Sequence, residues 1–589
     1  MIKQMKRYLG FIKGSWIFTI LSPIFVFCDV MLEMKLPQVA AEIIDVSIPE
    51  SVRTGDLSIL RRQILLMLLY SCGMLLLGFL AARCTAIASL GFTANMRTAL
   101  FNKVQDFSFE NLDKFTTSSL ITRIINDSSS IQMVFQTTLN FFVRAPFTLV
   151  YALIYALGIS RELSKVFIFV IPAILIVLIT LGVMVVPRFK AMLEKTDLFN
   201  RALQENFLGI RVVKSFVREK KENEKFGKAN TDLYNATMSA QKLLMYNMPV
   251  LMIILFGCMA YTLWTGSVLI YDQAGQEGAL EVGTLTAFTS YITSVISSLM
   301  TVTMIFMTMM MARASIKRVN EVLNDEPTFT DKDADRSLCV EEGSIEFKNV
   351  SFKYNKDAEK NVLENINFSI KAGETVGIIG ATGSAKSTLV SLIPRLYDVT
   401  GGEVLVGGND VRKYSFDRLR ENVSVVLQNN VLFSGTVKEN LLWGKPEATD
   451  EEIEEACRAA QADTFIREME NGYDTQLGQG GVNISGGQKQ RLCIARALLR
   501  KSKILIFDDS TSAVDTATDT KIREALKNNY PGMTQLIIAQ RINSVRHADR
   551  IIILDDGRIN AIGTHDELME KSEIYREIFV SQQEGVLAQ

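Results

Sequence analysis

Six long apolar stretches constrain the fold of this chain more than any other feature. They cover residues 15–35, 64–82, 139–157, 166–186, 243–264 and 284–311. At a rise of about 1.5 Å per residue, each is long enough to cross a hydrocarbon core of about 30 Å. Across 589 residues, a hydrophobic fraction of 48% and a mean hydropathy of +0.18 are too high for a wholly soluble protein. We therefore expect six transmembrane helices, which continue into the cytosol as amphipathic helices.

The composition changes after Arg313, where strands, glycine turns and charged helices replace the apolar stretches. The sequence predicts a transmembrane domain over 1–323, an acidic linker over 324–342 and a soluble domain over 343–589. Basic residues gather before the first stretch and between the fourth and fifth, whereas acids follow the fifth. Because basic loops stay on the cytoplasmic side of a membrane, we expect both termini and the soluble domain in the cytosol. The expected location is the plasma membrane.

Charge and cysteine content exclude several other classes of protein. The chain has 63 basic and 64 acidic residues and a net charge of −1, which gives no support to nucleic acid as a partner. Its seven cysteines are scattered and form no C-x-x-C pair. A disulfide scaffold or a zinc site is therefore not expected.

A phosphate-binding loop lies between a predicted strand and a predicted helix of the soluble domain. The apolar run 375–380 leads into G-A-T-G-S-A-K-S-T at 380–388. In such a loop, backbone N–H groups and the start of the helix face the phosphates of a nucleotide. Lys386 is expected to reach the β- and γ-phosphates, and the Ser387 hydroxyl to bind Mg²⁺. The predicted ATP-binding residues here are Gly380, Thr382, Gly383, Ser384, Ala385, Lys386, Ser387 and Thr388; Ala385 replaces the second glycine of the strict pattern.

Two further motifs follow in the soluble domain. The run I-L-I-F-D at 504–508 predicts a buried strand that presents Asp508 to Mg²⁺ at its carboxyl end. The run N-I-S-G-G-Q at 483–488 precedes it.

The order and content of these pieces resemble the ATP-binding cassette family, and the whole chain resembles a half-transporter of the exporter type. The fold that this implies is an α-helical membrane domain of six transmembrane helices fused to an α/β P-loop nucleotide-binding domain. The resemblance implies that Tyr354 stacks on adenine and that Gln428 binds Mg²⁺. It also implies that two cassettes close over two ATP molecules, each held between one chain's phosphate loop and the other chain's signature. The signature corresponds to Ser485, Gly486, Gly487 and Gln488, and Asp515 lies in the loop that crosses the dimer interface.

The sequence departs from the family at its two catalytic positions. Asp509 stands where the family has the glutamate that polarises water, and Gln540 stands where it has histidine. Aspartate is one methylene shorter, and glutamine does not carry a positive charge or shuttle a proton. The only histidines, His547 and His565, lie beyond the switch position. We therefore expect a heterodimer, in which this chain's own site is degenerate and its signature completes a competent site on a partner half-transporter with the glutamate and the histidine.

The expected function is ATP-driven export of drugs or other amphiphilic substrates. The cargo class, a hydrophobic or cationic small molecule or a lipid, follows from the resemblance alone. A nucleotide-gated regulator or channel and a homodimeric slow ATPase are the alternatives. Membrane lipids are expected to surround the helices.

Two features of the apolar half are candidates for cargo contact. Asp29 and Glu33 form an acid pair in the first stretch, which suits cationic cargo or equally the outer rim of the membrane. Methionines crowd the sixth stretch, where they suit either a cavity or gap-filling and lipid contact: Met300, Met304, Met307, Met309, Met310 and Met311. The resemblance also implies that segments 115–125 and 207–216 are the coupling helices that dock on the cassettes.

Overall fold

The structure, a computed structural model, describes residues 7–272, 280–355, 358–509 and 514–587. The chain divides into two compact units, which are described separately. The first unit contains residues 1–105 and 117–324, and the second contains residues 106–116 and 325–589.

The first unit is helical. Its helices are α2 (Trp16–Glu42), α3 (Ile48–Thr54), α4 (Ser58–Gln105), α6 (Thr117–Thr122), α7 (Ser128–Thr137), α8 (Val143–Ile159), α9 (Arg161–Ser164), α10 (Val166–Leu208), α11 (Ile210–Ser215), α12 (Glu219–Asp272) and α13 (Val282–Asn324). Short π-helical turns, Ile43–Ser47, Arg123–Asp127 and Thr138–Phe142, join α2 to α3, α6 to α7 and α7 to α8.

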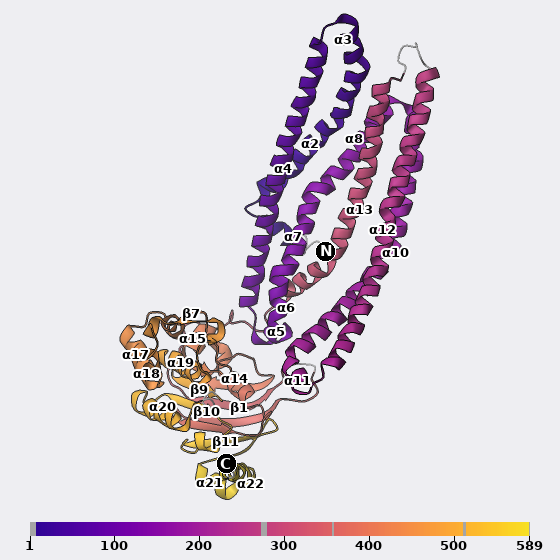
Figure 1. Cartoon of the computed structure of the whole chain (residues 1–589). Coiled ribbons are helices and arrows are strands. Elements are labelled where there is room, and N and C mark those ends of the chain that lie inside the picture. The colour runs from indigo at the N-terminus through magenta and orange to yellow at the C-terminus, as the bar shows by residue number, and fades with distance from the viewer. Residues whose placement is uncertain (1–6, 273–279, 356–357, 510–513, 588–589) are drawn as a thin grey trace. The chain divides into compact units, whose positions relative to one another are not determined.

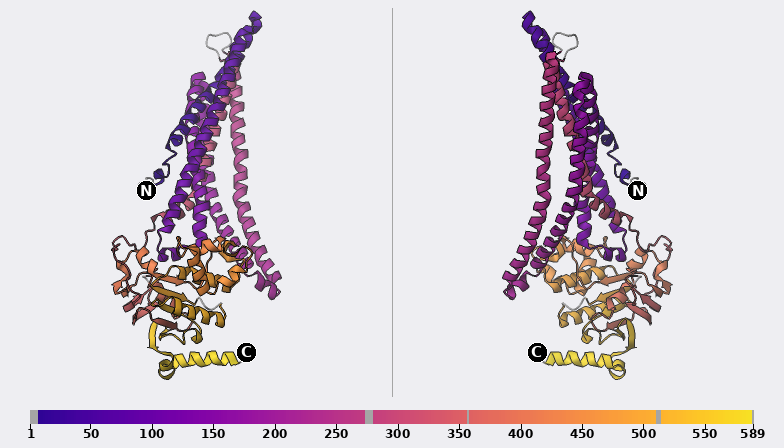
Figure 2. Two further views of the ribbon diagram at one scale, coloured as in Figure 1. Left: turned by 90° about the vertical axis from the view of Figure 1, so that its left-hand side faces the viewer. Right: turned by 90° about the vertical axis from the view of Figure 1, so that its right-hand side faces the viewer.

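Six helical segments of the described chain are long and apolar enough to cross a membrane, which confirms the six predicted spans. They run over Trp16–Thr54, Ser58–Gln105, Thr117–Ile159, Arg161–Leu208, Glu219–Asp272 and Val282–Asn324. With 39 to 54 residues each, they exceed the length of about 20 residues that a bilayer requires. Within this unit α2 packs along α4, and α10 packs along α12 (Figure 1, Figure 2).

The acid pair of the first span has a basic partner. Arg144 of α8 donates to Asp29 Oδ2 at 2.8 Å and to Glu33 Oε2 at 2.5 Å. Asp29 is buried, and Glu33 and Arg144 are partly exposed. The guanidinium therefore offsets one of the two negative charges, and the acids do not form an unpaired anionic site for cationic cargo.

The division into two units cuts through the first of the two predicted coupling segments. The segment that belongs to the second unit is 106–116, with helix α5 (Phe109–Lys114), so only two residues of the predicted 115–125 belong to it. Helix α6 belongs to the first unit. The predicted 207–216 contains the short helix α11, which lies in the first unit with exposed apolar side chains.

The second unit is built on two larger sheets and a two-stranded pair. The larger sheet has the order β12-β11-β3-β10-β9-β6, in which all strands but β12 run parallel. The second sheet is antiparallel with the order β2-β1-β4-β5, and β7 pairs with β8. The strands are β1 (Ile345–Phe352), β2 (Leu363–Ile370), β3 (Thr375–Ile379), β4 (Gly401–Val406), β5 (Asn409–Asp410), β6 (Val423–Val426), β7 (Gly435–Thr436), β8 (Gln476–Leu477), β9 (Ile504–Asp508), β10 (Thr534–Ile538), β11 (Arg550–Asp555) and β12 (Arg558–Gly563).

Helices surround these sheets. Besides α5 they are α14 (Lys386–Ser391), α15 (Phe416–Asn422), α16 (Val437–Leu442), α17 (Asp450–Ala459), α18 (Asp463–Arg467), α19 (Gly486–Leu499), α20 (Thr516–Asn529), α21 (His565–Lys571) and α22 (Glu573–Leu587). The stretch predicted as the linker has no regular helix or strand after Asn324 and belongs to this unit, where Asp335 forms a β-bridge with Tyr414.

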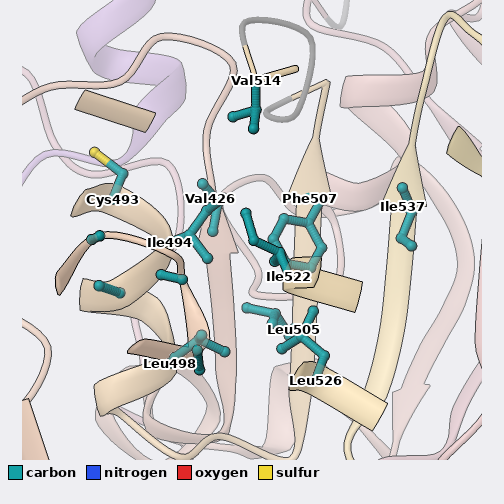
Figure 3. Close-up of a cluster of buried hydrophobic side chains, with 14 of the residues drawn as sticks. Val426, Cys493, Ile494, Leu498, Leu505, Phe507, Val514, Ile522, Leu526 and Ile537 are labelled. Carbon is teal, nitrogen blue, oxygen red and sulfur yellow. The ribbon is translucent and has the colours of Figure 1, made fainter. Parts of the chain in front are cut away.

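A buried core fixes α19 and α20 to the parallel sheet. Figure 3 shows Ile494 of α19 beside Val426 of β6, and Ile522 of α20 beside Phe507 of β9; Leu498 of α19 belongs to the same core. These side chains are all at most 2% exposed. Burying an aliphatic or aromatic side chain of this size contributes about 1.5–3 kcal/mol, so the core holds the loops at the strand ends in place.

Candidate nucleotide-binding site

The topology gathers the predicted site residues at one edge of the larger sheet. Strands β3, β10, β9 and β6 are parallel neighbours, so their carboxyl ends lie along the same edge. The phosphate loop follows β3, Gln540 follows β10, Asp508 ends β9, and Gln428 follows β6. Ligands of open α/β sheets bind outside this edge.

The phosphate loop has a backbone that only small residues allow. A Cβ atom on Gly380 would lie 2.1 Å from the carbonyl oxygen of Leu554, so this position requires glycine. Ala385, the N-cap of α14, has φ 72° and ψ 25°, in the left-handed region that favours glycine. The alanine therefore takes up the conformation that the missing glycine would adopt without strain.

Lys386, Ser387 and Asp508 form a connected polar cluster. The Ser387 hydroxyl donates to Asp508 Oδ1 at 2.7 Å, and Lys386 Nζ donates to the carbonyl oxygens of Gly380 and Ala381, each at 2.8 Å. Burial lowers the pKa of Lys386, against the opposing charges of Asp509 and Asp508. Burial likewise raises the pKa of Asp508, and the charge of Asp509 adds to that rise.

Two glutamine amides hold the carboxylate of Asp509. Gln540 Nε2 donates to Asp509 Oδ2 at 2.7 Å, and Gln428 Nε2 approaches the same oxygen at 3.4 Å. Asp509 has φ 47°, and its backbone N–H donates to the carbonyl oxygen of Ile538 in β10. Asp509 Oδ2 therefore binds both Gln540, the other residue that departs from the family, and Gln428, a predicted Mg²⁺ ligand.

The predicted adenine-stacking residue lies against the same loop. The Tyr354 hydroxyl and Thr388 Oγ1 are 2.9 Å apart, and the Tyr354 side chain is partly exposed, at 43%. Its ring packs edge-on against Tyr397, with centroids 5.2 Å apart. The sequence did not predict a role for Tyr397. The only hint in the sequence is that an aromatic residue follows shortly after the helix of the phosphate loop.

Tyr397 also joins this aromatic pair to α5. Its hydroxyl donates to Asp113 at 2.7 Å, and its ring lies 5.9 Å from that of Phe109. Burial and the nearby Asp113 raise the pKa of Tyr397, which keeps the hydroxyl proton in place. Lys114 and Asn111 of α5 bind Asp325 in the same unit.

The signature is a separate part of the second unit. Ser485 and Gln488 form a capping box at the start of α19: the Gln488 N–H donates to Ser485 Oγ at 3.2 Å, and the Ser485 N–H donates to Gln488 Oε1 at 2.9 Å. Gly486 and Gly487 form the first turn of this 14-residue helix. The capping hydrogen bonds of Ser485 and Gln488 stay within the signature. Those that join Ser387 to Asp508 and hold Asp509 stay within the cluster at the sheet edge.

The predicted interface loop is described in part. Asp515 caps α20 by accepting from the Thr518 N–H at 2.9 Å, and that bond lowers the pKa of Asp515. Residues 510–513 lie outside the described residues. Shortly before the signature, Gln479–Gly481 forms a 3₁₀ turn in which Gly480 has φ 68°.

Comparison with known proteins gives consistent matches along the chain. The model of the ABC transporter transmembrane region matches residues 19–300, and the ABC transporter model matches residues 363–512. The uncharacterized ABC transporter ATP-binding protein YfiB of Bacillus subtilis is 36% identical over 588 residues, which are 98% of each chain. The ATP-dependent lipid A-core flippase of Desulfotalea psychrophila is 32% identical over 82% of this chain and 83% of the flippase. The putative multidrug export ATP-binding/permease protein YgaD of Bacillus subtilis is 34% identical over 83% of each.

A solved structure supports the fold. The structure of a bacterial Atm1-family ABC exporter with ATP bound matches with a TM-score of 0.80 and 24% identity, over 96% of this chain and 98% of that one. With a helical membrane domain and a nucleotide-binding domain in one polypeptide, the chain belongs to the ABC transporter family and has the fold of an ABC exporter.

Proposed function

We propose that this chain is one half of a heterodimeric exporter that moves drugs or other amphiphilic substrates out across the cell membrane. In this proposal residues 1–323 form the transmembrane domain, and residues 343–589 form a cytosolic domain that binds ATP and Mg²⁺. The observation that carries the proposal is the pair of glutamine amides on the carboxylate of Asp509.

The polar cluster fits ATP and Mg²⁺ by its chemistry. The hydroxyl of Ser387 and the carboxylate of Asp508 are oxygen ligands of the kind that Mg²⁺ prefers. The amide oxygen of Gln428 adds a third such ligand near Asp509. Lys386 is a cation held at the phosphate loop by the carbonyl oxygens of Gly380 and Ala381, and Tyr354 offers a partly exposed ring to a base. Bound ATP would supply the phosphoryl group, and Mg²⁺ would offset its charge.

The position of the general base favours slow hydrolysis at this chain's own site. Asp509 is one methylene shorter than glutamate, and misplacing a reacting group by about 1 Å costs about 100-fold in rate. The amides of Gln540 and Gln428 donate to its carboxylate, but neither amide takes up or releases a proton near pH 7. The site is therefore suited to holding ATP rather than to rapid turnover.

The signature supports a complementary role for the other half of the exporter. The capping box of Ser485 and Gln488 preforms the start of α19, whose backbone N–H groups favour an anion. We propose that this helix start completes the site of a partner that has the glutamate and the histidine. A pair of identical chains would have two slow sites, which is why a heterodimer is the better proposal.

Exposed apolar surfaces on each unit also fit assembly with a second chain. Around α11, Val212 and Phe216 are 59% and 72% exposed. On the second unit, Phe433 stacks on Trp443 in an exposed pair with centroids 4.2 Å apart. Apolar surfaces of this kind mark sites of protein interaction. We propose that α11 docks on the partner's cassette.

The cargo class rests on the relatives, one named as a lipid A-core flippase and one as a putative multidrug exporter. The methionines of α13 fit an amphiphilic cargo: Met304, Met309, Met310 and Met311 are exposed, and the side chain of Met307 lies outside the described residues. Because Arg144 pairs with both acids of α2, this cluster gives no specific support to a cationic cargo over other amphiphiles.

The first experiment measures nucleotide binding and ATP turnover by the purified chain alone, in the same sample. We expect ATP binding without turnover, and loss of binding in Lys386→Ala. Turnover near about 1 s⁻¹, at the low end of ordinary enzyme rates, would support the homodimeric ATPase and contradict the heterodimer.

A gain-of-function variant sharpens this test. The double substitution Asp509→Glu with Gln540→His should raise turnover by at least about 10-fold, because it restores the reach and the proton transfer of the catalytic pair. With the partner present, cargo must accumulate against its gradient only while ATP is hydrolysed. Cargo flow that stops at equal concentrations would instead support the nucleotide-gated channel.

A further inference from the structure

The C-terminal helix holds the loop that contains Gln540. Gln582 of α22 donates from Nε2 to the carbonyl oxygen of Gln540 at 2.7 Å. Its Oε1 accepts from the backbone N–H of Ile542 at 2.9 Å. The Gln582 amide therefore binds the backbone on both sides of Arg541. It accepts one backbone hydrogen bond and donates another, as a neighbouring β-strand does.

This clamp continues to the candidate catalytic carboxylate. Gln540, whose carbonyl oxygen is held by Gln582, donates from its side-chain Nε2 to Asp509 Oδ2 at 2.7 Å. A change in the backbone at Gln540 must therefore move its amide away from Asp509. The hydrogen bonds of Gln582 thus act on the reacting groups through Gln540.

Packing within the C-terminal hairpin keeps α22 in position. Tyr575 of α22 is fully buried, and its hydroxyl lies 2.7 Å from His565 Nδ1 of α21. The His565 ring also contacts Phe579, with centroids 5.5 Å apart. Figure 2 shows these two helices, in yellow, together at the C-terminal end of the chain. The amide of Gln582 is therefore presented to the loop from a packed element.

We propose that Gln582 is a positioning residue for the nucleotide site: it sets the Gln540–Ile542 backbone so that the Gln540 amide meets Asp509 and the γ-phosphate of ATP. The α22 helix thereby takes part in telling ATP from ADP at this site. This inference rests on the proposed function in one respect, that Gln540 faces the γ-phosphate.

The test uses the full-length chain in detergent with three variants. Gln582→Ala removes both hydrogen bonds, and Gln582→Glu keeps the acceptor for Ile542 but loses the donor to Gln540. Glu577→Gln, at an exposed position of the same helix, is the matched control. Two quantities are measured: amide hydrogen exchange over residues 536–546, and the dissociation constants of ATP and ADP with Mg²⁺.

We expect Gln582→Ala to speed exchange at Ile542 and to weaken ATP binding by about 3- to 10-fold, the range that one hydrogen bond supports, while ADP binding is unchanged. Gln582→Glu should keep Ile542 protected and still lose ATP preference. Gln540→Ala should lose the same preference, and the double variant with Gln582→Ala should lose no more, because both act through one contact.

Three results with the variants would overturn the inference: wild-type exchange and ATP preference in Gln582→Ala, equal weakening of ATP and ADP binding, or additive effects of the Gln582 and Gln540 substitutions. A wild-type chain that binds both nucleotides equally would also overturn it. Failure to bind any nucleotide would instead contradict the proposed function, and the exchange data would then still decide whether Gln582 holds the loop.

Discussion

Ala385 has a backbone conformation that conflicts with its side chain. Its φ of 72° costs a residue with a Cβ about 1–2 kcal/mol relative to right-handed backbone. Ala385→Gly should therefore raise the thermal midpoint of the cassette and tighten ATP binding, as followed by differential scanning fluorimetry with and without ATP. Ala525→Gly, inside the helix α20, should instead lower the thermal midpoint, because glycine in a helix interior costs about 1 kcal/mol of stability. A lower midpoint for Ala385→Gly would show that the methyl packing of Ala385 outweighs the strain.

At the same scale, the sequence predicted the meeting of Lys386, Ser387 and Asp508 because each residue ends a strand or follows one, and parallel strands share an edge. It did not predict that Gln428 and Gln540 converge on one oxygen of Asp509. That geometry depends on loop dihedrals, which no periodicity encodes. The contact of Gln582 was also missed, because it joins residues 42 apart through a single amide.

Among elements, α5 shows how a local cap decides which unit a segment joins. Ser108 and Asn111 form a capping box that starts this short helix, and Tyr397 then holds its Asp113. The predicted coupling segment 115–125, which followed from the family resemblance, shares only residues 115 and 116 with the segment that joins the second unit. The side chains that contact α5 come from the second unit, far along the chain.

Tyr397→Phe tests that contact. The phenyl ring keeps its packing against Tyr354 and Phe109 but loses the hydroxyl that donates to Asp113. A hydrogen bond to a charged group contributes about 1.5–3 kcal/mol, so hydrogen exchange over 106–116 should become faster. ATP affinity should stay within about twofold, because the ring contact with Tyr354 remains. Unchanged exchange would mean that Phe109 packing alone holds α5, and Asp113→Asn should then also be silent.

The hairpin of α21 and α22 should depend on pH through His565. Burial, with the charge of Arg546, lowers the pKa of His565 below its usual 6.5, so the folded hairpin binds fewer protons than the unfolded one. Its stability is then complete above pH 6.5 and falls as the pH drops through the lowered pKa. Protection factors over 565–580, corrected for intrinsic exchange, should decrease from pH 7.5 to 5.5. His565→Gln should remove that decrease; a decrease of the same size in this variant would assign it to another group.

For the whole molecule, hydropathy alone predicted six spans, because an apolar helix long enough to cross a bilayer has few alternatives. Hydropathy did not predict the strand order of the cassette. It also did not predict that residues 106–116 join the second unit, because both features depend on contacts between distant segments. The exposed apolar face of α11 belongs to this scale, because the proposed assembly with a second chain would cover it.

Val212→Asp should therefore leave the chain folded and able to bind ATP, yet weaken its association with a second chain. The reason is that an ionised carboxylate buried without a partner costs several kcal/mol. Size-exclusion chromatography with light scattering would measure the association, and Arg211→Gln on the same helix is the control. Association equal to that of the wild type would assign the α11 surface to something other than assembly.

The Asp29–Arg144–Glu33 cluster has a consequence for how the chain is made. Two acids in one apolar helix oppose insertion by about 2.5–3.5 kcal/mol each when they lie near the bilayer centre. Their guanidinium partner is encoded 111 residues after Glu33, so at ribosomal speeds of about 5–20 residues per second it emerges about 6–22 s later. During that interval the two acids lack the basic partner that they have in the folded chain, so we expect the first hairpin to insert stably only after α8 is made.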